Sequence, residues 1–159
     1  MRVIIAAVGR LKEGAERELV DRYIERLAGA RAIGLGPIRV TEVMEGRQPT
    51  APARQDNEAA RLLHAAQGAD VLITLDEKGK ALSSEAFARM LAKWRDEGAS
   101  TAAFLIGGPD GHGKAAREGA TLSLSLGPMT LPHGLARVLL VEQLYRAFTI
   151  LSGHPYHRA

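Results

Sequence analysis

The sequence predicts an α/β protein built as a three-layer sandwich, with a mostly parallel sheet between two layers of helices. Short apolar runs alternate along the chain with longer segments whose apolar residues repeat at helical spacing. The length of 159 residues suits one domain, 1–159, with its own core. A hydrophobic fraction of 46% argues against disorder. Alternation of this kind is typical of a parallel sheet covered on both faces.

The elements follow in the order β-α-β-α-β-α-β-α-β-α. Strands are predicted over residues 2–8, 38–43, 70–76, 101–108 and 121–126. Helices are predicted over 13–28, about 53–66, from Ser83 or Ser84 onward, 112–119 and about 132–151. We expect "MEGRQPTAP" to be a candidate mobile loop and "EKGKALSSE" to turn the chain into the next helix. Ligands of such sheets bind beyond the carboxyl ends of the strands, where "TLDEKGK" and "GGPDGHG" lie.

Composition limits the classes of function. The chain has no cysteine, which excludes disulfides and thiolate metal sites and fits a cytoplasmic location. No apolar run is long enough to span a bilayer, so we expect no membrane partner. The net charge is +3 and residues 132–159 are basic, which permits a nucleic acid partner. An ordinary solvated surface explains the charge equally well.

The predicted last helix, about 132–151, is apolar on nearly all sides. A helix at the surface of a sandwich needs only one apolar face, so the surplus predicts a second partner. The simplest partner is a second copy of the chain, which predicts a homodimer. Burial by the chain's own tail and loops is the alternative.

Two loops are candidate ligand sites. "GGPDGHG" lacks the lysine of a Walker loop and the spacing of a dinucleotide fingerprint, so it is either a ligand loop or a tight turn. The loop in "LSLGPMTLPHG" is rich in Leu and Met, so we expect it to be buried. Its main chain could then bond other protein groups or read the edge of a planar base such as adenine.

The remaining candidate functional residues carry weaker sequence signals. Asp76, Glu77 and Asp110 lie near strand ends and could act as a base or bind a hydroxyl, although solvated acids near turns are common. The histidines show no metal-binding helix pair, so we expect no metal. In the ending "HPYHRA", Tyr156 can stack on an unpaired base and Arg158 can contact phosphate, unless the end is simply frayed.

Taken together, "TLDEKGK", "FLIGGPDG", "LSLGPMTLPHGLARVLLVEQLYRA" and the final "HPYHR" closely resemble the ribosomal large subunit methyltransferase H family, a SPOUT-class family. The similarity covers essentially the whole chain. It implies a deep trefoil knot near the C-terminus, which general topology rules would not predict. It also implies a cytoplasmic homodimer that uses S-adenosylmethionine. The implied reaction methylates N3 of a pseudouridine in helix 69 of 23S rRNA, on the assembled ribosome and without a metal.

The resemblance also implies site residues. Cofactor positions of the family match Leu75, Gly107, Leu126, Gly127, Pro128, Met129, Thr130 and Leu131. We expect the apolar members to enclose adenine and Gly107 to leave room for the ribose and methionyl parts. Pro128 has no N–H, so a neighbour such as Met129 or Thr130 must donate any main-chain hydrogen bond.

For the catalytic step we hypothesise that the tail acts on the RNA. His157 would be the base or proton relay, Tyr156 would position the pseudouridine, and Arg158 would hold a phosphate or favour the deprotonated imide. His133, Arg137 and Arg146 are secondary candidates for the dimer interface or RNA contact. The alternatives are a related knotted methyltransferase that acts on tRNA, and a ribosome-binding factor without catalysis.

Overall fold

A five-stranded sheet forms the middle of the molecule, and all of its strand pairs are parallel. The computed structural model describes residues 1–157, with side chains as far as Tyr156. Across the sheet the strands are β2 (Ile38–Val43), β1 (Arg2–Val8), β4 (Thr101–Ile106), β3 (Val71–Ala81) and β5 (Leu122–Ser125). The predicted parallel α/β architecture is therefore confirmed, with β2 and β5 at the edges.

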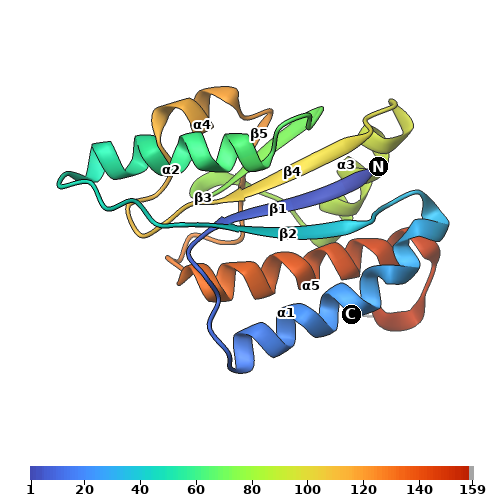
Figure 1. Ribbon diagram of the computed structural model, residues 1–159. Coiled ribbons are helices and arrows are strands. Elements are labelled where there is room, and N and C mark those ends of the chain that lie inside the picture. Colours follow the sequence, from blue (N-terminus) through green and yellow to red (C-terminus); the bar gives the residue numbers. More distant parts are fainter. Residues whose placement is uncertain (158–159) are drawn as a thin grey trace.

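Helices cover both faces of the sheet, which gives three layers (Figure 1). One layer holds α2 (Ala51–Ala65) and α4 (Lys114–Gly119), and the other holds α1 (Ala15–Arg26), α3 (Ser84–Asp96) and α5 (His133–Ser152). Two short 3-10 helices, η1 (Leu27–Ile33) and η2 (Pro155–His157), follow α1 and α5. Among residues 1–157 no helix is both long and apolar enough to cross a bilayer.

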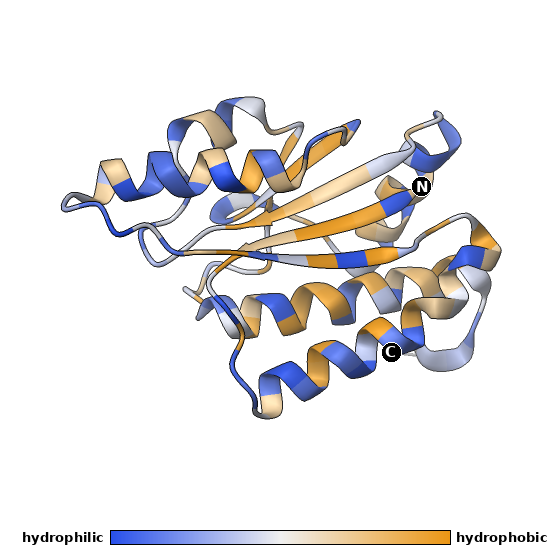
Figure 2. Cartoon of the chain, viewed as in Figure 1, coloured by the Kyte–Doolittle hydropathy of each residue, from blue (hydrophilic) through white to orange (hydrophobic). Residues whose placement is uncertain are grey.

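The core lies on both sides of the two central strands. In β4, Phe104 packs toward α1, α3 and α5, whereas Leu105 packs toward α2 and α4. Both side chains are fully buried, and each burial stabilises the fold by about 1.5–3 kcal/mol. Figure 2 shows the same pattern, since hydrophobic colour concentrates on the sheet and on α5 while the outer sides of α1 and α2 are hydrophilic.

Strand β3 is longer than predicted. The turn expected over "EKGKALSSE" begins later, because β3 continues to Ala81. Leu75 and Lys80 both lie opposite Leu124 of β5, with a register shift between them. Gly79 makes this close crossing possible, because a Cβ there would lie 2.8 Å from the backbone of β5. The "TLDEKGK" motif is thus an irregular strand that bends around β5.

Helix α5 lies between neighbours of its own chain. It packs beside α1 and α3 and against the sheet, which explains why it is apolar on most sides. The chain itself therefore covers much of the surplus apolar surface that predicted a dimer. Two leucines remain exposed on α5, Leu135 at 42% and Leu139 at 38%. They lie one turn apart near the start of the helix.

Candidate functional site

The strand register brings three predicted cofactor segments to one place. Leu75 of β3 lies opposite Ile106 of β4 on one side and Leu124 of β5 on the other. Gly107 follows Ile106 directly, and Leu126 begins the loop that follows β5. The carboxyl edge of a parallel sheet is where such proteins bind ligands. Leu75, Gly107 and the loop 126–131 therefore border one region, although their predicted role in cofactor binding stays a prediction.

A buried histidine connects the glycine loop, residues 107–113, with Leu75 of β3. His112 is 2% exposed, and its Nε2 lies 3.0 Å from the carbonyl oxygen of Leu75, to which it donates as the neutral tautomer. Burial lowers the pKa of His112, against a smaller opposing effect of the bond to Leu75. The imidazole is consequently neutral near pH 7. The sequence motifs gave His112 no role, although its position between Gly111 and Gly113 was a signal that could have pointed to it.

The glycines of the loop permit close packing. Gly111 donates its N–H to the carbonyl oxygen of Gly108 at 2.9 Å, which closes a tight turn. A Cβ at Gly108 would lie 2.7 Å from Oε2 of Glu58, and a Cβ at Gly113 would lie 2.5 Å from a carbonyl oxygen of α2. The space beside Gly107 is also taken, since its Cβ would lie 3.1 Å from Gly111. Packing alone therefore explains these glycines.

An arginine of α2 holds the same loop from outside. Nε of Arg54 donates to Oδ2 of Asp110 at 2.7 Å, and Nη2 donates to Oδ1 at 3.2 Å. The side chain of Gln55 donates to the carbonyl oxygen of Asp110. The hydrogen bond from Arg54 lowers the pKa of Asp110. Asp110 is therefore a paired carboxylate that fixes the loop, which disfavours the role of general base that the sequence left open.

Helix α2 also holds the segment predicted to be mobile. Nη1 of Arg54 donates to the carbonyl oxygen of Gln48 at 3.1 Å, and Gly46 donates its N–H to Oε1 of Glu58 at 2.8 Å. Thr50 caps the helix through a bond from Ala53. Through Arg54, α2 thus connects the 44–50 segment with the glycine loop.

The Gly-Pro loop is exposed, contrary to the sequence prediction that it is buried. Pro128, Met129 and Thr130 are all exposed, and Met129 reaches 77%. The prediction was wrong because an apolar composition does not by itself require burial within the same chain. Among the described residues, the N–H groups of Met129, Thr130 and Leu131 make no hydrogen bond. An apolar surface beside unpaired main-chain donors fits the flat, polar-edged base of an adenosyl group.

Polar side chains fix the base of this loop. Oγ of Ser125 lies 3.1 Å from the carbonyl oxygen of Glu77 and 2.9 Å from that of Gly127, so it can donate to either, and it accepts from Gly127 N–H at 3.1 Å. Oγ1 of Thr130 donates to Oε2 of Glu77 at 2.7 Å. Asp76 accepts from the N–H of Lys78. Glu77 thus holds the loop to the bend in β3, and Asp76 stabilises that bend.

Within one chain, the tail lies away from these loops. The hydroxyl of Tyr156 lies 3.3 Å from that of Tyr23 and 3.4 Å from Oε1 of Glu142, and its ring packs edge-on against Tyr145. Desolvation raises the pKa of Tyr156. The chain's own α1 and α5 therefore hold this tyrosine. The side chain of His157 and all of Arg158 lie outside the described residues.

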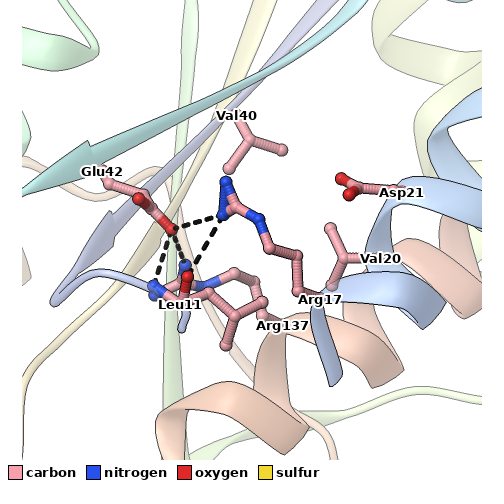
Figure 3. A pocket seen from close by; sticks show the side chains of 7 residues that line it. All are labelled: Leu11, Arg17, Val20, Asp21, Val40, Glu42 and Arg137. Atoms are coloured by element: carbon pink, nitrogen blue, oxygen red, sulfur yellow. Dashed lines mark hydrogen bonds and ion pairs between the residues drawn. The ribbon is translucent and has the colours of Figure 1, made fainter. Parts of the chain in front are cut away.

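Arg137, a secondary candidate for RNA contact or the dimer interface, is instead part of the core. Its side chain is fully buried, and Nη1 donates to Oε1 of Glu42 at 2.7 Å (Figure 3). Nη2 donates to the carbonyl oxygen of Gly9 at 2.9 Å. Burial lowers the pKa of Arg137, and Glu42 opposes this. The apolar helix α5 can bury this arginine because the carboxylate of Glu42, on β2, pairs with its guanidinium. RNA contact is thereby excluded for Arg137 in this fold.

The other two secondary candidates differ. Arg146 pairs with Glu142 one turn earlier on α5 at 2.7 Å and lies over the ring of Tyr156, 5.3 Å from its centre. The bond to Glu142 raises the pKa of Arg146. It therefore helps to dock the tail. His133 is half-buried at the start of α5, beside Gly9.

Two hollows lie outside the predicted cofactor region. One, of about 200 Å³, is the charged cavity around Arg17, Glu42 and Arg137 in Figure 3. The other is a groove of about 570 Å³ between β2 and α2. No group of three or more histidine or carboxylate side chains suited to a metal occurs within residues 1–157.

The fold and the loop arrangement define a class: a parallel α/β protein with a candidate ligand site at the carboxyl edge of its sheet. A family model described as "Predicted SPOUT methyltransferase" matches residues 1–157. The chain therefore belongs to the SPOUT methyltransferase family, as the resemblance implied.

Similar curated proteins indicate which members of this family the chain resembles. Proteins named "Ribosomal RNA large subunit methyltransferase H" are 52% identical in Brucella anthropi and 50% identical in Rhodopseudomonas palustris, each over 100% of both chains. One from Rhizobium etli is 53% identical over 99% of both chains. A crystal structure of a probable methyltransferase from Bordetella pertussis has a TM-score of 0.54 at 16% identity, covering 92% of this chain and 96% of that one. The last likeness concerns the fold alone.

Proposed function

We propose that this protein is a methyltransferase of large-subunit ribosomal RNA that methylates N3 of a pseudouridine in helix 69 of 23S rRNA. The family and the names of relatives at about 50% identity support the reaction class and the substrate. The observation that carries the proposal is the meeting of Leu75, Gly107 and the loop 126–131 at one edge of the sheet.

S-adenosylmethionine is the methyl donor of the proposal, and its sulfonium supplies an electrophilic methyl group when it is bound. The unpaired N–H groups of Met129, Thr130 and Leu131 would hold the polar edge of the adenine. Leu75 and Met129 would contact its faces. The bonds from His112 to Leu75 and from Thr130 to Glu77 keep two of these segments in place before the donor binds. Such pre-positioning supplies much of the rate of an in-line displacement.

The N3 proton must leave the pseudouridine during the reaction. Within the proposal, His157 accepts or relays this proton, Tyr156 positions the base, and Arg158 holds a phosphate or stabilises the imide anion. Substituting His157→Ala should lower turnover while the affinity for the donor stays unchanged. An unchanged turnover would remove His157 from the mechanism.

The active form in this proposal is a homodimer. The tail docks on Glu142 and Tyr145 of its own chain, which lie about 14–18 Å along α5 from the end of the Gly-Pro loop that precedes this helix. A tail held so far along α5 is better placed to serve a second copy. Exposed Leu135 and Leu139 provide apolar surface for that contact. Sedimentation should give a dimer for the wild type and a monomer for Leu135→Glu/Leu139→Glu.

The proposal includes a trefoil knot, in which β5 passes through the loop made by the end of β3. The double register of Leu124 with Leu75 and Lys80 supports it, as does the bond from Ser125 to Glu77. The proposal also places the enzyme in the cytoplasm, where ribosomes are found. An experimentally phased map with an unthreaded chain between residues 71 and 131 would contradict the knot.

The experiment is labelled methyl transfer from S-adenosylmethionine to ribosomes purified from a strain that lacks this enzyme, followed by mapping of the modified base. We expect one methyl group per large subunit, at N3 of a helix 69 pseudouridine. Incorporation into tRNA instead would favour a tRNA methyltransferase. Ribosome binding without donor binding in calorimetry would favour a non-catalytic factor.

A further inference from the structure

The groove between β2 and α2 lies on the opposite side of the sheet from α5. Its lining comes from alternate residues of β2, the residue after it, and the outward side of α2. These residues are Arg39, Thr41, Val43, Met44, Asn57, Ala60, Arg61, His64 and Ala65. The groove has no part in the cofactor region described above.

The groove is positively charged. Arg39 and Arg61 contribute two guanidinium groups and His64 an exposed imidazole, whereas no carboxylate of the described part of the chain lines the groove. The alternation of β2 turns Glu42 to the other face, where it pairs with Arg137. The positive charge on this side of β2 is therefore not neutralised from within the groove.

Both arginines keep donors available. Nε of Arg39 donates to Thr41 at 3.2 Å, and Nη1 of Arg61 donates to the carbonyl oxygen of Met44 at 2.8 Å. Among the described residues neither guanidinium has an ion pair. Each bond orients its guanidinium and leaves further N–H groups for an anion. Arginine held in this way suits the oxygens of a phosphate.

The position of the groove relates it to the reaction. It ends at Val43, the last residue of β2, and at Met44 just beyond it, at the same edge of the sheet as Gly107. Only β1 separates β2 from β4, which amounts to about 10 Å at the usual strand spacing. An RNA strand that reaches the glycine loop can therefore extend over β1 into the groove. Met44, 71% exposed, offers an apolar contact at its mouth.

We propose that this groove is a second RNA-binding site, which holds backbone phosphates of the ribosomal RNA next to the target nucleotide. Contacts of this kind position the substrate and carry no sequence information. The inference rests on the proposed function only in taking ribosomal RNA as the substrate. The groove adds affinity for that RNA and leaves donor binding and the chemical step unaffected.

The test measures methyl transfer to ribosomes with the double variant Arg39→Gln/Arg61→Gln at several salt concentrations. We expect the KM for ribosomes to rise roughly five- to twentyfold, with kcat and the Kd for S-adenosylmethionine unchanged. The slope of log(kcat/KM) against log[salt] should become shallower by about 1.5, because each lost phosphate contact removes about 0.7–0.9. Arg39→Lys/Arg61→Lys keeps the charge and should restore most of the affinity.

The matched control is Arg22→Gln/Arg89→Gln, which removes two exposed arginines from the other helix layer. The inference is overturned if the KM of the groove variant is unchanged, or if the control raises it equally. A higher KM with an unchanged salt slope also overturns it, since the partner would then be an uncharged protein surface. If the wild type methylates no ribosomal RNA, the proposed function fails first, and that result is distinct from all of these.

Discussion

Arg54 and Asp110 form a two-bond ion pair, at 2.7 and 3.2 Å, that joins α2 to the glycine loop. The same arginine donates to the carbonyl oxygens of Gln48 and Pro49. One side chain thus connects two loops at the carboxyl edge of the sheet. We infer that it positions the glycine loop for the methyl donor.

Substituting Asp110→Asn should weaken donor binding by roughly three- to tenfold, because the loop loses its charged anchor without losing bulk. Calorimetric titration with S-adenosylmethionine measures this. Glu97→Gln, which removes an exposed ion pair with Lys93 on α3, serves as the control and should leave the Kd unchanged. Equal affinity for the wild type and Asp110→Asn would show that the ion pair plays no part in binding.

The same pair predicts a pH dependence. Arg54 lowers the pKa of Asp110 in the folded protein, so the unfolded state binds the proton more readily. The stabilisation is complete above the unfolded pKa, near 4, and is lost as the pH falls through the lower folded value. The difference in unfolding free energy between wild type and Asp110→Asn should therefore shrink below about pH 4. A difference that grows toward acid pH would contradict this assignment.

His112 predicts a second pH dependence at higher pH. Burial lowers its pKa in the folded protein, so its contribution to stability is complete above the unfolded pKa of about 6.5 and is lost as the pH falls toward the folded value. His112→Gln can still donate to the carbonyl oxygen of Leu75 but cannot take up a proton. Urea unfolding between pH 7.5 and 5 should show a smaller loss of stability for His112→Gln than for the wild type. The control His64→Gln removes an exposed imidazole instead of a buried one. If His112→Gln lost as much stability between pH 7.5 and 5 as the wild type does, the assignment would be wrong.

The Arg137–Glu42 pair should be important for stability. Arg137→Met removes the buried partner of Glu42 and the donor to the carbonyl oxygen of Gly9, and should cost about 1–3 kcal/mol in the free energy of unfolding, because Glu42 remains partly solvated and keeps its contact with Arg17. Urea unfolding measures this loss. The double variant Glu42→Gln/Arg137→Met should be more stable than the single one, because it removes a carboxylate left with only the 4.0 Å contact to Arg17, while Gln can still accept from Leu11 N–H. A loss under about 0.5 kcal/mol for Arg137→Met would refute the pair's role.

Thr130→Val tests the contact that fixes the Gly-Pro loop. The variant keeps the shape but loses the 2.7 Å bond to Glu77, so the loop should be less ordered before the donor binds. Donor affinity should fall about two- to fivefold, consistent with a hydrogen bond of about 0.5–1 kcal/mol. The control is Thr121→Val, at the exposed residue before the start of β5. It makes the same substitution and also removes one hydroxyl hydrogen bond, the one from Leu72 N–H. An unchanged Kd for Thr130→Val would mean that Glu77 does not organise the loop.

Much of the fold could be predicted from local sequence patterns. The predictions that were wrong concerned contacts between residues far apart in the chain. Apolar runs and helical spacing located β1, β2, β4 and α5 within a few residues. The extension of β3 to Ala81 could not be predicted, because "EKGK" has strand geometry only through its pairing with β5. Likewise, the buried Arg137 looked like a surface residue, since the carboxylate that neutralises it lies 95 residues away in the chain.

The candidate site shows the same division. The motifs marked Leu75, Gly107 and the loop 126–131, and the register of three strands brings them together. No sequence motif gave a role to His112 or Arg54, which act through backbone carbonyls and a paired carboxylate. Such roles depend on which groups lie opposite in the fold. The burial expected of the Gly-Pro loop was wrong for its middle, because Pro128 and Met129 face outward in the single chain.

The most direct measurement is a crystal structure of this protein with S-adenosylmethionine. We expect the adenine to lie beside Leu75, with its polar edge bonded to main-chain N–H groups of residues 129–131, and the methyl group to lie near Gly107. Donor density in the groove between β2 and α2, or elsewhere away from these three segments, would contradict it.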